Sequence, residues 1–508
     1  MNANRASRCA LIANNAMNTQ ISKWLVLAII SSSVFLSVMD IFIVNVAIPA
    51  IKAGIHGTDS DIQLVIALYL LGYAIFLVTG GRAGDYFGKK KVFVVAMLLF
   101  VAISAVCGFA QTPWQLNAAR FFQGVSAAWM IPQGITYIQE LFPGGRERVK
   151  ALGIYGTVAG SASVIGQFLG GLLPEVESFL EGWRLVFLIN LPIGLLVLPM
   201  ALLFLPPDRR PDDSRNAAFD FSGVLLLTGA LACLIYPLIR GRELNWPWWC
   251  IAMPGLGVML IAMFSRDQKQ KLTVGKQPLL DVRLFGFRDF NIGMAIVLFY
   301  FMVQDSYFLI NVMLLETGLG FSSAETGVLF VFQGIGYVIA SLVSLRLVPL
   351  FDKKVLQVGV LIMVITLAMH IIALNGPEVD RYLLYPILFA YGTGCGSVLP
   401  SLLAVGLKNI PVELAGAASG TFSTFQQTAI ALGIGVIGGI FFSNLGPLAD
   451  VATYISAYRI ATITNIALLA LVGFFLWLLP EDETVCSVKK PTSREGSIRT
   501  AGRLKSSR

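Results

Sequence analysis

This 508-residue sequence contains few charged residues. Charged residues make up 13% of the chain, hydrophobic residues make up 56%, and the mean hydropathy is +0.76. A soluble protein carries about 25% charged residues, and a soluble fold this apolar would expose a large hydrophobic surface. The composition therefore excludes an ordinary cytosolic enzyme and predicts a protein that crosses the membrane several times.

Histidine and cysteine are also scarce. The two histidines, His56 and His370, suit a loop or packing role better than that of a metal ligand. The six cysteines form no C-x-x-C pair, so the sequence offers neither a disulfide framework nor a zinc site. A G-x-x-x-x-G-K-[ST] phosphate loop and an H-E-x-x-H metal helix are missing as well. We therefore expect no cofactor, no metal and no enzymatic activity.

Long apolar runs, by contrast, are abundant. A helix needs about 20 apolar residues to cross the hydrocarbon core of a bilayer, and fourteen runs are candidates. They lie at about residues 24–50, 62–80, 92–110, 115–139, 151–173, 185–205, 220–239, 247–264, 290–314, 325–345, 355–374, 382–407, 414–442 and 460–479. The eighth run begins WPWWC and carries Pro254, so we expect it to be short or partly interfacial.

Basic residues indicate how these spans are oriented. They outnumber acidic residues by 37 to 29, and cytoplasmic loops of membrane proteins carry such an excess. With both termini in the cytoplasm, 30 basic residues fall in cytoplasmic segments and 6 in outer loops, while Arg120 lies within a span. The positive charge therefore predicts contact with the lipid bilayer and no binding of nucleic acid. The polar N-terminus does not resemble a cleavable signal peptide, and translation could start at Met1 or Met17.

Three ionisable residues interrupt the apolar runs: Asp40, Arg120 and Asp305. At mid-membrane each costs about 2.5–3.5 kcal/mol on insertion scales, so such residues are paired, face water or serve function. At 1.5 Å per residue they lie roughly 15, 9 and 13 Å below the outer ends of their spans, which would allow a shared polar cavity. Two interpretations of Asp40 and Arg120 stay open, a static buried ion pair and a protonatable carboxylate tuned by the arginine.

The loop between the second and third spans, GGRAGDYFGKKK (80–91), resembles the signature G-x-L-A-D-R-x-G-R-K of the major facilitator superfamily. Ala83 and Tyr86 depart from that signature. A weaker echo, RLVPLFDKK (346–354), suggests an internal repeat. The matching positions are Gly81, Asp85, Gly88, Lys89 and Lys90.

Further motifs resemble the fourteen-helix drug:proton antiporter branch of that family. ARFFQGVSAAWMIPQG (119–134) is similar to its R-x-x-Q-G-x-x-A pattern, and MDIFIVNVAIPAI (39–51) to its first-helix motif with an aspartate. WRLVFLINLPIG (183–194) is also typical of the branch. GTVAGSASVIGQFLGGLL (156–173) resembles the antiporter motif ending G-P-x-x-G-G, with Gln167 in place of proline. The small residues Gly166, Gly170 and Gly171 also suit simple helix packing.

The resemblance implies an all-α membrane protein with a major-facilitator-type fold: two six-helix bundles plus two extra helices, giving 14 transmembrane helices. We divide the chain into a cytoplasmic N-terminal segment (1–23), an N-terminal six-helix bundle (24–205), a two-helix insert with a cytoplasmic linker (206–289), a C-terminal six-helix bundle (290–480) and a disordered basic cytoplasmic tail (481–508).

The same resemblance implies a proton-coupled exporter of amphipathic, cationic compounds that works by alternating access. Asp40 would take the proton and Arg120 would tune it. Aromatic rings suit flat cations through cation–π contacts. The residues expected to contact the substrate are Asp305, Gln304, Tyr69, Tyr73, Gln123, Trp129, Gln133 and Gln426.

Other functions stay open. Export of an endogenous metabolite or siderophore is the main alternative, and a non-transporting membrane sensor built on the same scaffold is another. The expected partners are a small-molecule substrate, protons and the bilayer, while a periplasmic adaptor is left undecided. The expected location is the plasma membrane, as a multi-pass protein of a bacterial inner membrane.

Overall fold

The computed structural model describes residues 23–142, 145–177, 179–207, 220–241, 243–276, 278–376, 379–406, 414–445 and 449–479. Within these ranges all the regular elements are helical, and thirteen helices are long and apolar enough to cross a membrane. The helix α5 (Pro113–Leu141) has the length of a span but a lower hydropathy, and it completes the expected fourteen. Our expectations for the N-terminal segment before Lys23 and for the tail (481–508) fall outside the described residues.

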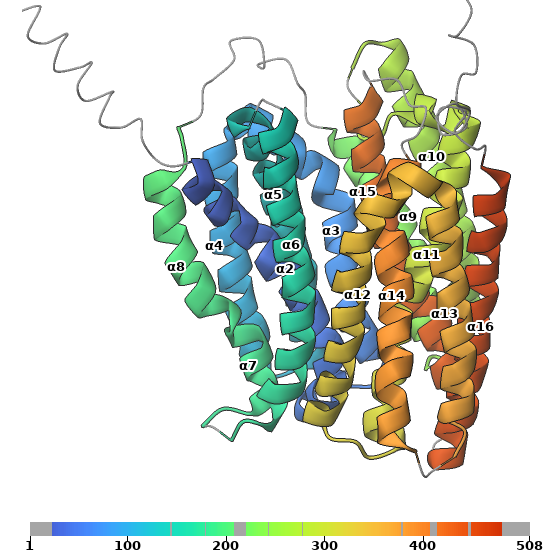
Figure 1. Ribbon diagram of the computed structural model, residues 1–508. Helices are drawn as coiled ribbons and strands as arrows, with labels where there is room; N and C mark the ends of the chain where they lie inside the picture. Colours follow the sequence, from blue (N-terminus) through green and yellow to red (C-terminus); the bar gives the residue numbers. More distant parts are fainter. Residues whose placement is uncertain are drawn as a thin grey trace, which may run out of the picture.

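The N-terminal bundle contains the first six spans, and its sixth span is interrupted for one residue at Ile189 (Figure 1). A short turn, η1 (Leu173–Glu175), follows the fifth span. The helices are α2 (Lys23–Ile55), α3 (Asp59–Phe87), α4 (Lys89–Gly108), α5, α6 (Gly145–Leu172), α7 (Gly182–Leu188) and α8 (Asn190–Phe204).

The C-terminal bundle follows a two-helix insert, α9 (Phe221–Arg240) and α10 (Trp248–Thr273), and a short turn, η3 (Val282–Gly286). Its first helix ends in a π-helical segment, η4 (Met313–Gly318). Its helices are α11 (Arg288–Val312), α12 (Ser323–Phe351), α13 (Lys353–Ala373), α14 (Arg381–Gly406), α15 (Ala415–Ser443) and α16 (Val451–Leu478).

Two boundaries differ from the sequence expectation. The helix α10 continues to Thr273, so the eighth span is not short and the expected linker begins inside a helix. The helix α16 begins at Val451 rather than near residue 460. Its N-cap is Asp450, whose carboxylate accepts a hydrogen bond from the backbone amide of Thr453. Polar residues in the first turns of α16 hid this start from an apolar-run count.

Close helix crossings repeat between the two bundles. In the N-terminal bundle, a Cβ atom at Gly124 of α5 would lie 2.0 Å from the carbonyl oxygen of Tyr69 on α3. In the C-terminal bundle, a Cβ atom at Gly392 of α14 would lie 2.0 Å from the carbonyl oxygen of Gln333 on α12. The second and fourth helices of each bundle therefore approach backbone to backbone, as an internal repeat predicts.

The two bundles touch at the end where α2 joins α3, the lower end in Figure 1. A Cβ atom at Gly171 of α6 would lie 2.3 Å from the carbonyl oxygen of Ser323 on α12. Nearby, the backbone amide of Ala324 donates to Glu175 across the same boundary (2.9 Å). We call this contact region, which joins α6 and η1 to the start of α12, the seam.

The insert is tied to the N-terminal bundle at the same end. Arg240, the last residue of α9, forms ion pairs with Asp61 of α3 and with Glu243 (2.9 Å to the latter). Glu243 also accepts a hydrogen bond from the backbone amide of Ser60 (3.1 Å). Burial opposes ionisation of Glu243, but hydrogen bonds from Thr58 and Ser60 and the nearby Arg240 outweigh it and lower its pKa.

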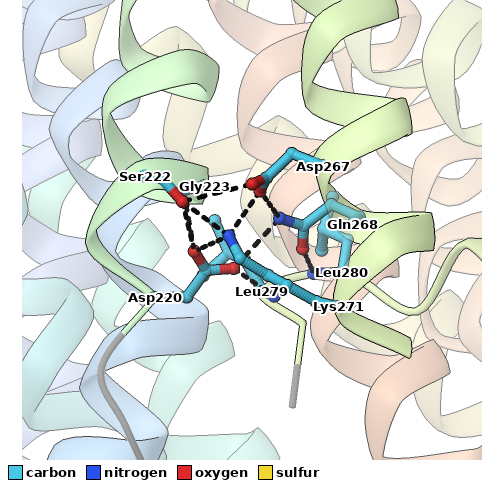
Figure 2. A network of polar contacts seen from close by, with 8 residues as sticks. All are labelled: Asp220, Ser222, Gly223, Asp267, Gln268, Lys271, Leu279 and Leu280. Atoms are coloured by element: carbon cyan, nitrogen blue, oxygen red, sulfur yellow. Dashed lines mark hydrogen bonds and ion pairs between the residues drawn. The ribbon is translucent and has the colours of Figure 1, made fainter. Parts of the chain in front are cut away.

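The opposite end of the insert is tied to the segment that leads into α11, as Figure 2 shows. Asp220 forms an ion pair with Lys271 of α10 and accepts hydrogen bonds from Gln268 (3.0 Å) and the backbone amide of Leu279 (2.9 Å). Gln268 in turn accepts a hydrogen bond from the backbone amide of Leu280 (3.1 Å). Burial opposes ionisation of Asp220, but the hydrogen bonds from Lys271 and Gln268 outweigh it and lower its pKa.

Candidate functional site

A buried ion pair lies at the centre of the N-terminal bundle. Asp40 of α2 is 0% exposed and Arg120 of α5 is 1% exposed, and the guanidinium donates to Oδ2 of the carboxylate. Burying two charges is expensive, so such a pair depends on the further hydrogen bonds that its two side chains make.

Arg120 makes further contacts within the bundle. Its Nε donates to the carbonyl oxygen of Val65 (3.1 Å), and its Nη1 also donates to Oε1 of Gln123 (2.8 Å). The guanidinium carbon lies 4.3 Å from the centre of the Tyr69 ring, which is a cation–π contact. Tyr69, which we expected to contact the substrate, therefore stacks on the arginine.

The other oxygen of Asp40, Oδ1, accepts hydrogen bonds from two carboxamides. Nε2 of Gln123 donates at 3.0 Å, and Nδ2 of Asn190 donates at 2.9 Å. Both nitrogens also donate to the hydroxyl of Ser104 (3.2 and 3.0 Å), which donates to the carbonyl oxygen of Phe187 (2.8 Å). One network thus joins α2, α4, α5, α7 and α8.

Two glycines bring α6 against the helix that carries Asp40. A Cβ atom at Gly166 would lie 2.8 Å from the carbonyl oxygen of Met39, and one at Gly170 would lie 2.5 Å from that of Ile43. Gly171, the next residue, faces the seam instead. The glycine motif of the fifth span therefore packs on two partners, α2 within its own bundle and α12 in the other.

A second buried carboxylate joins the two bundles. Asp305 of α11 is 3% exposed, and its Oδ1 accepts a hydrogen bond from Nδ2 of Asn45 on α2 (3.0 Å). Oδ1 of Asn45 and Oε1 of Gln304 are buried and have no hydrogen-bond partner among the described residues. Among those residues, no hydrogen bond links Asp305 to the network of Asp40, so the two carboxylates form separate sites.

Comparison with known proteins places the chain in a family. The family profile of the Major Facilitator Superfamily matches residues 30–434, and a second, overlapping match covers residues 293–507. The chain belongs to the Major Facilitator Superfamily. Among curated members, it is 34% identical to the "Probable actinorhodin transporter" of Streptomyces coelicolor over 87% of this chain and 76% of that one. It is 30% identical to the puromycin resistance protein pur8 of Streptomyces alboniger over 91% of this chain and 92% of that one.

Solved members of the Major Facilitator Superfamily have the same fold. A D-xylose–proton symporter aligns with a TM-score of 0.63 over 90% of this chain and 98% of its own, at 15% sequence identity. At that identity the likeness concerns the fold alone. The family consists of transporters, and the bacterial relatives indicate a multi-pass protein of the plasma membrane.

The loop signature of the Major Facilitator Superfamily connects α3 and α4 through a single glycine. Gly88 has φ +98°, a conformation that side chains rarely adopt, so a larger residue there would strain the joint. Gly81 lies on α3, where a Cβ atom would be 3.7 Å from Cβ of Pro132 on α5. The backbone of Asp85 is part of α3, but its side chain lies outside the described residues.

The two lysines after Gly88 bind different helices. Lys89 forms an ion pair with Glu140, near the end of α5. Lys90 donates to the carbonyl oxygen of Leu205, directly after α8 (2.8 Å). The basic end of this loop therefore holds the ends of the fourth and sixth spans together, whatever further role it has in transport.

The other residues expected to contact the substrate lie in several places. Gln123 is part of the Asp40 network. Nε2 of Gln133 donates to the carbonyl oxygens of Gly80 (2.7 Å) and Trp129 (3.2 Å). The indole Nε1 of half-buried Trp129 has no partner among the described residues. Tyr73 is buried on α3, and Gln426 is half-buried on α15.

Two hollows among the described residues lie away from all of these positions. One, of about 430 Å³, is an apolar groove between α4 and α5 that includes Trp114 and Phe122. The other, of about 570 Å³, lies between the ends of α13 and α16 and includes Arg459. The central cavity therefore stays a prediction.

Sequence reasoning missed Ser104 and Asn190, because single small polar residues in apolar runs resemble ordinary packing residues. It also missed a polar cluster inside the C-terminal bundle. Nδ1 of His370 donates to the carbonyl oxygen of Thr366 (2.7 Å), which leaves Nε2 to accept from the hydroxyl of Tyr307 (3.2 Å). Tyr391 stacks on Tyr307 with 4.0 Å between ring centres.

Proposed function

We propose that this protein exports a small molecule across the plasma membrane in exchange for protons, by alternating access. The observation that carries the proposal is the fully buried pair of Asp40 and Arg120. Charges in a membrane interior are rare and mark ion or proton pathways. The names of the relatives, which refer to transport and to antibiotic resistance, support export as the direction.

In this proposal Asp40 binds and releases the proton, and Arg120 responds to its charge. An ionised Asp40 holds the guanidinium firmly, whereas a protonated Asp40 releases part of that attraction and frees α5 to shift against α2. A proton that crosses the membrane supplies about 2.3 kcal/mol per 100 mV, in addition to the pH gradient. The loop residues Gly81, Asp85, Gly88, Lys89 and Lys90 and the glycines of α6 would guide the accompanying movement.

Asp305 is our candidate for substrate contact. It lies on the boundary between the bundles, where a substrate in the proposed central cavity can reach it, and its one hydrogen bond crosses that boundary to Asn45. A cationic substrate that pairs with Asp305 would replace this bond. With both termini in the cytoplasm, as we propose, the seam lies on the outer side, so the described conformation would open inward.

Export of a neutral metabolite is the second candidate. Asn45 contacts Asp305 across the boundary, and Gln304 precedes Asp305 in the chain. The side-chain oxygens of both residues are buried without a partner among the described residues, and carboxamides bind neutral hydroxyl and amide groups as readily as cations. A binding panel on the purified protein separates the two functions. A drug exporter would bind many unrelated lipophilic cations, whereas a metabolite exporter would bind one neutral compound or a few related ones.

The experiment uses inside-out membrane vesicles with an acidic interior and follows ethidium uptake together with proton efflux. We expect Asp40→Asn to abolish both while the protein still inserts, because that side chain can no longer take a proton. Asp450→Asn removes a carboxylate at the N-cap of α16, where asparagine caps equally well, so it is the matched control and should keep both. Normal proton-coupled ethidium transport by Asp40→Asn would contradict the assignment of Asp40.

A further inference from the structure

The hydrogen bonds around Asp40 fit only one of its two charge states. Arg120 donates to Oδ2, and Gln123 and Asn190 donate to Oδ1, so each contact presents a hydrogen to the carboxylate. A protonated carboxyl group has an O–H of its own, which needs an acceptor. In this dry interior an O–H without an acceptor would oppose protonation, because buried polar groups need partners.

Few acceptors are within reach. Oε1 of Gln123 already accepts from Arg120 (2.8 Å) and from the thiol of Cys107 (3.6 Å). The hydroxyl of Tyr69 points away and donates to the carbonyl oxygen of Ser37 (3.5 Å). Arg120, Tyr69 and Cys107 are the charged or titratable groups that face Asp40 from α5, α3 and α4, and they offer it donors or occupied acceptors.

Asn190 differs from these neighbours. Its side chain is 0% exposed, and its Nδ2 donates twice, to Asp40 and to Ser104. Its Oδ1 is buried and has no hydrogen-bond partner among the described residues. The residue therefore carries an unused acceptor within one carboxamide rotation of the carboxylate. It is also the first residue of α8, next to the interruption of the sixth span at Ile189.

We propose that the carboxamide of Asn190 turns over when Asp40 takes a proton, so that its Oδ1 accepts the new O–H. A proton arriving from water forms an O–H bond at Oδ1 of Asp40, and no bond breaks at Asn190. Asn190 loses its two donated hydrogen bonds and accepts two, one from Asp40 and one from Ser104, whose hydroxyl turns away from the carbonyl oxygen of Phe187. Asn190 is thus a positioning residue that serves both states of Asp40.

This inference rests on the proposed role of Asp40 and adds a consequence for its neighbours. The orientation of the Asn190 carboxamide on α8 would then depend on the charge of Asp40 on α2. Ser104 would hold either orientation, since a hydroxyl donates and accepts equally well. The sixth span is thereby coupled to the proton although it carries no ionisable residue near the site.

The test is pH-difference infrared spectroscopy of the full-length protein in liposomes, which records the carbonyl band of a protonated carboxylic acid. Asp40→Asn identifies the band of Asp40, which should disappear in that variant. In Asn190→Leu we expect the band to move to higher wavenumber, because the acid loses its acceptor.

Two further variants keep the inference testable if Asn190→Leu does not fold. Asn190→Ser retains a donor and an acceptor and should leave the band close to its native position. Ser104→Ala should move the band in the same direction by less. Unchanged band positions in Asn190→Leu and Ser104→Ala would overturn the role of Asn190. Absence of any band that depends on Asp40 would instead overturn the proposed function, and with it this inference.

Discussion

The first, third, fourth and sixth spans of the N-terminal bundle meet around a charged pair, and those of the C-terminal bundle meet around neutral groups. The first group contains Asp40, Ser104, Arg120 and Asn190. The second group contains Tyr307, His370, Tyr391 and, beside it, Asn465, which accepts from Ser306 at 3.3 Å. Similar helices thus support two different interiors.

The difference shows which bundle of this fold buries charged groups, whose desolvation costs free energy. A buried ion pair is seldom more stable than a well-packed apolar or neutral core, so its presence in one half alone points to use rather than to stability. The His370 cluster is uncharged, and its central hydrogen bonds join His370 to Thr366 and to Tyr307. We propose that the N-terminal bundle is the half that responds to protons, while the C-terminal bundle contributes Asp305 at the boundary between the bundles.

The largest effect should come from breaking the charged interior on one side only. Arg120→Leu leaves Asp40 buried without its cation, and removing one partner of such a pair costs about 3–5 kcal/mol. We expect thermal unfolding in detergent to show this loss, together with loss of transport. The double variant Asp40→Asn/Arg120→Leu removes both charges and should recover part of the stability. An unfolding temperature of Arg120→Leu equal to that of the native protein would contradict the claim that the buried charged pair distinguishes the N-terminal interior from the C-terminal one.

The matching change in the neutral interior should cost less. His370→Leu leaves the hydroxyl of Tyr307 buried without its acceptor, which costs roughly 1–2 kcal/mol. Tyr307→Phe in the same chain removes that hydroxyl and should restore most of the loss. Proton-coupled transport should persist with an unchanged pH profile in vesicles. A shifted pH profile would show that the C-terminal bundle also responds to protons.

A charged network outside the bundle interiors sharpens the comparison. Asp220→Asn weakens the ion pair with Lys271, and we expect a loss of roughly 1–2 kcal/mol at pH 7. Because the folded pKa of Asp220 is lowered, its contribution is present above the unfolded pKa and is lost as the pH falls through the folded pKa. Unfolding measured well below pH ~3.9 should therefore show little difference between native and variant protein. A difference that persists in acid would mean that packing, not charge, is lost.

The smallest effect is expected at an exposed ion pair. Lys23 and Glu147 pair at 2.6 Å, but their side chains are 38% and 55% exposed. Water and salt screen such pairs, so Lys23→Gln should change the unfolding free energy by less than about 0.5 kcal/mol. Unfolding of both proteins at low and high salt provides the measurement. A loss of unfolding free energy comparable to that of Arg120→Leu would show that burial does not explain the large effect expected for the Asp40–Arg120 pair.

The sequence was sufficient to locate the spans and to single out Asp40 and Arg120, which the structure brings together. Apolar length locates the helices, and a charge inside an apolar run, as at Asp40 and Arg120, stands out because it is costly. Uncharged residues such as Asn190 give no such signal, since one asparagine is tolerated in many helices. The contact of Asn45 with Asp305 joins residues 260 positions apart, and only the packing of α2 on α11 brings them together.

The cluster of His370 shows a different limit. A lone histidine in an apolar run fits a packing role, and that interpretation agrees with its place among aromatic rings. Its hydrogen bond to Tyr307, however, depends on two helices whose pairing no local pattern encodes. The start of α16 differs for a simpler reason. The first turns of this helix are too weakly hydrophobic to belong to the apolar run, and the capping residues Asp450 and Thr453 mark its start instead.

The attachment of the insert at both ends has a mechanical consequence. Arg240 fastens one end of α9 to α3, and Asp220 fastens the other end to the chain that enters α11. A helix attached to both bundles limits how far they can rotate apart. If the bundles rock about the substrate, either the ion pairs of Arg240 must break or α9 must tilt. These two attachments would then set how widely the bundles can open.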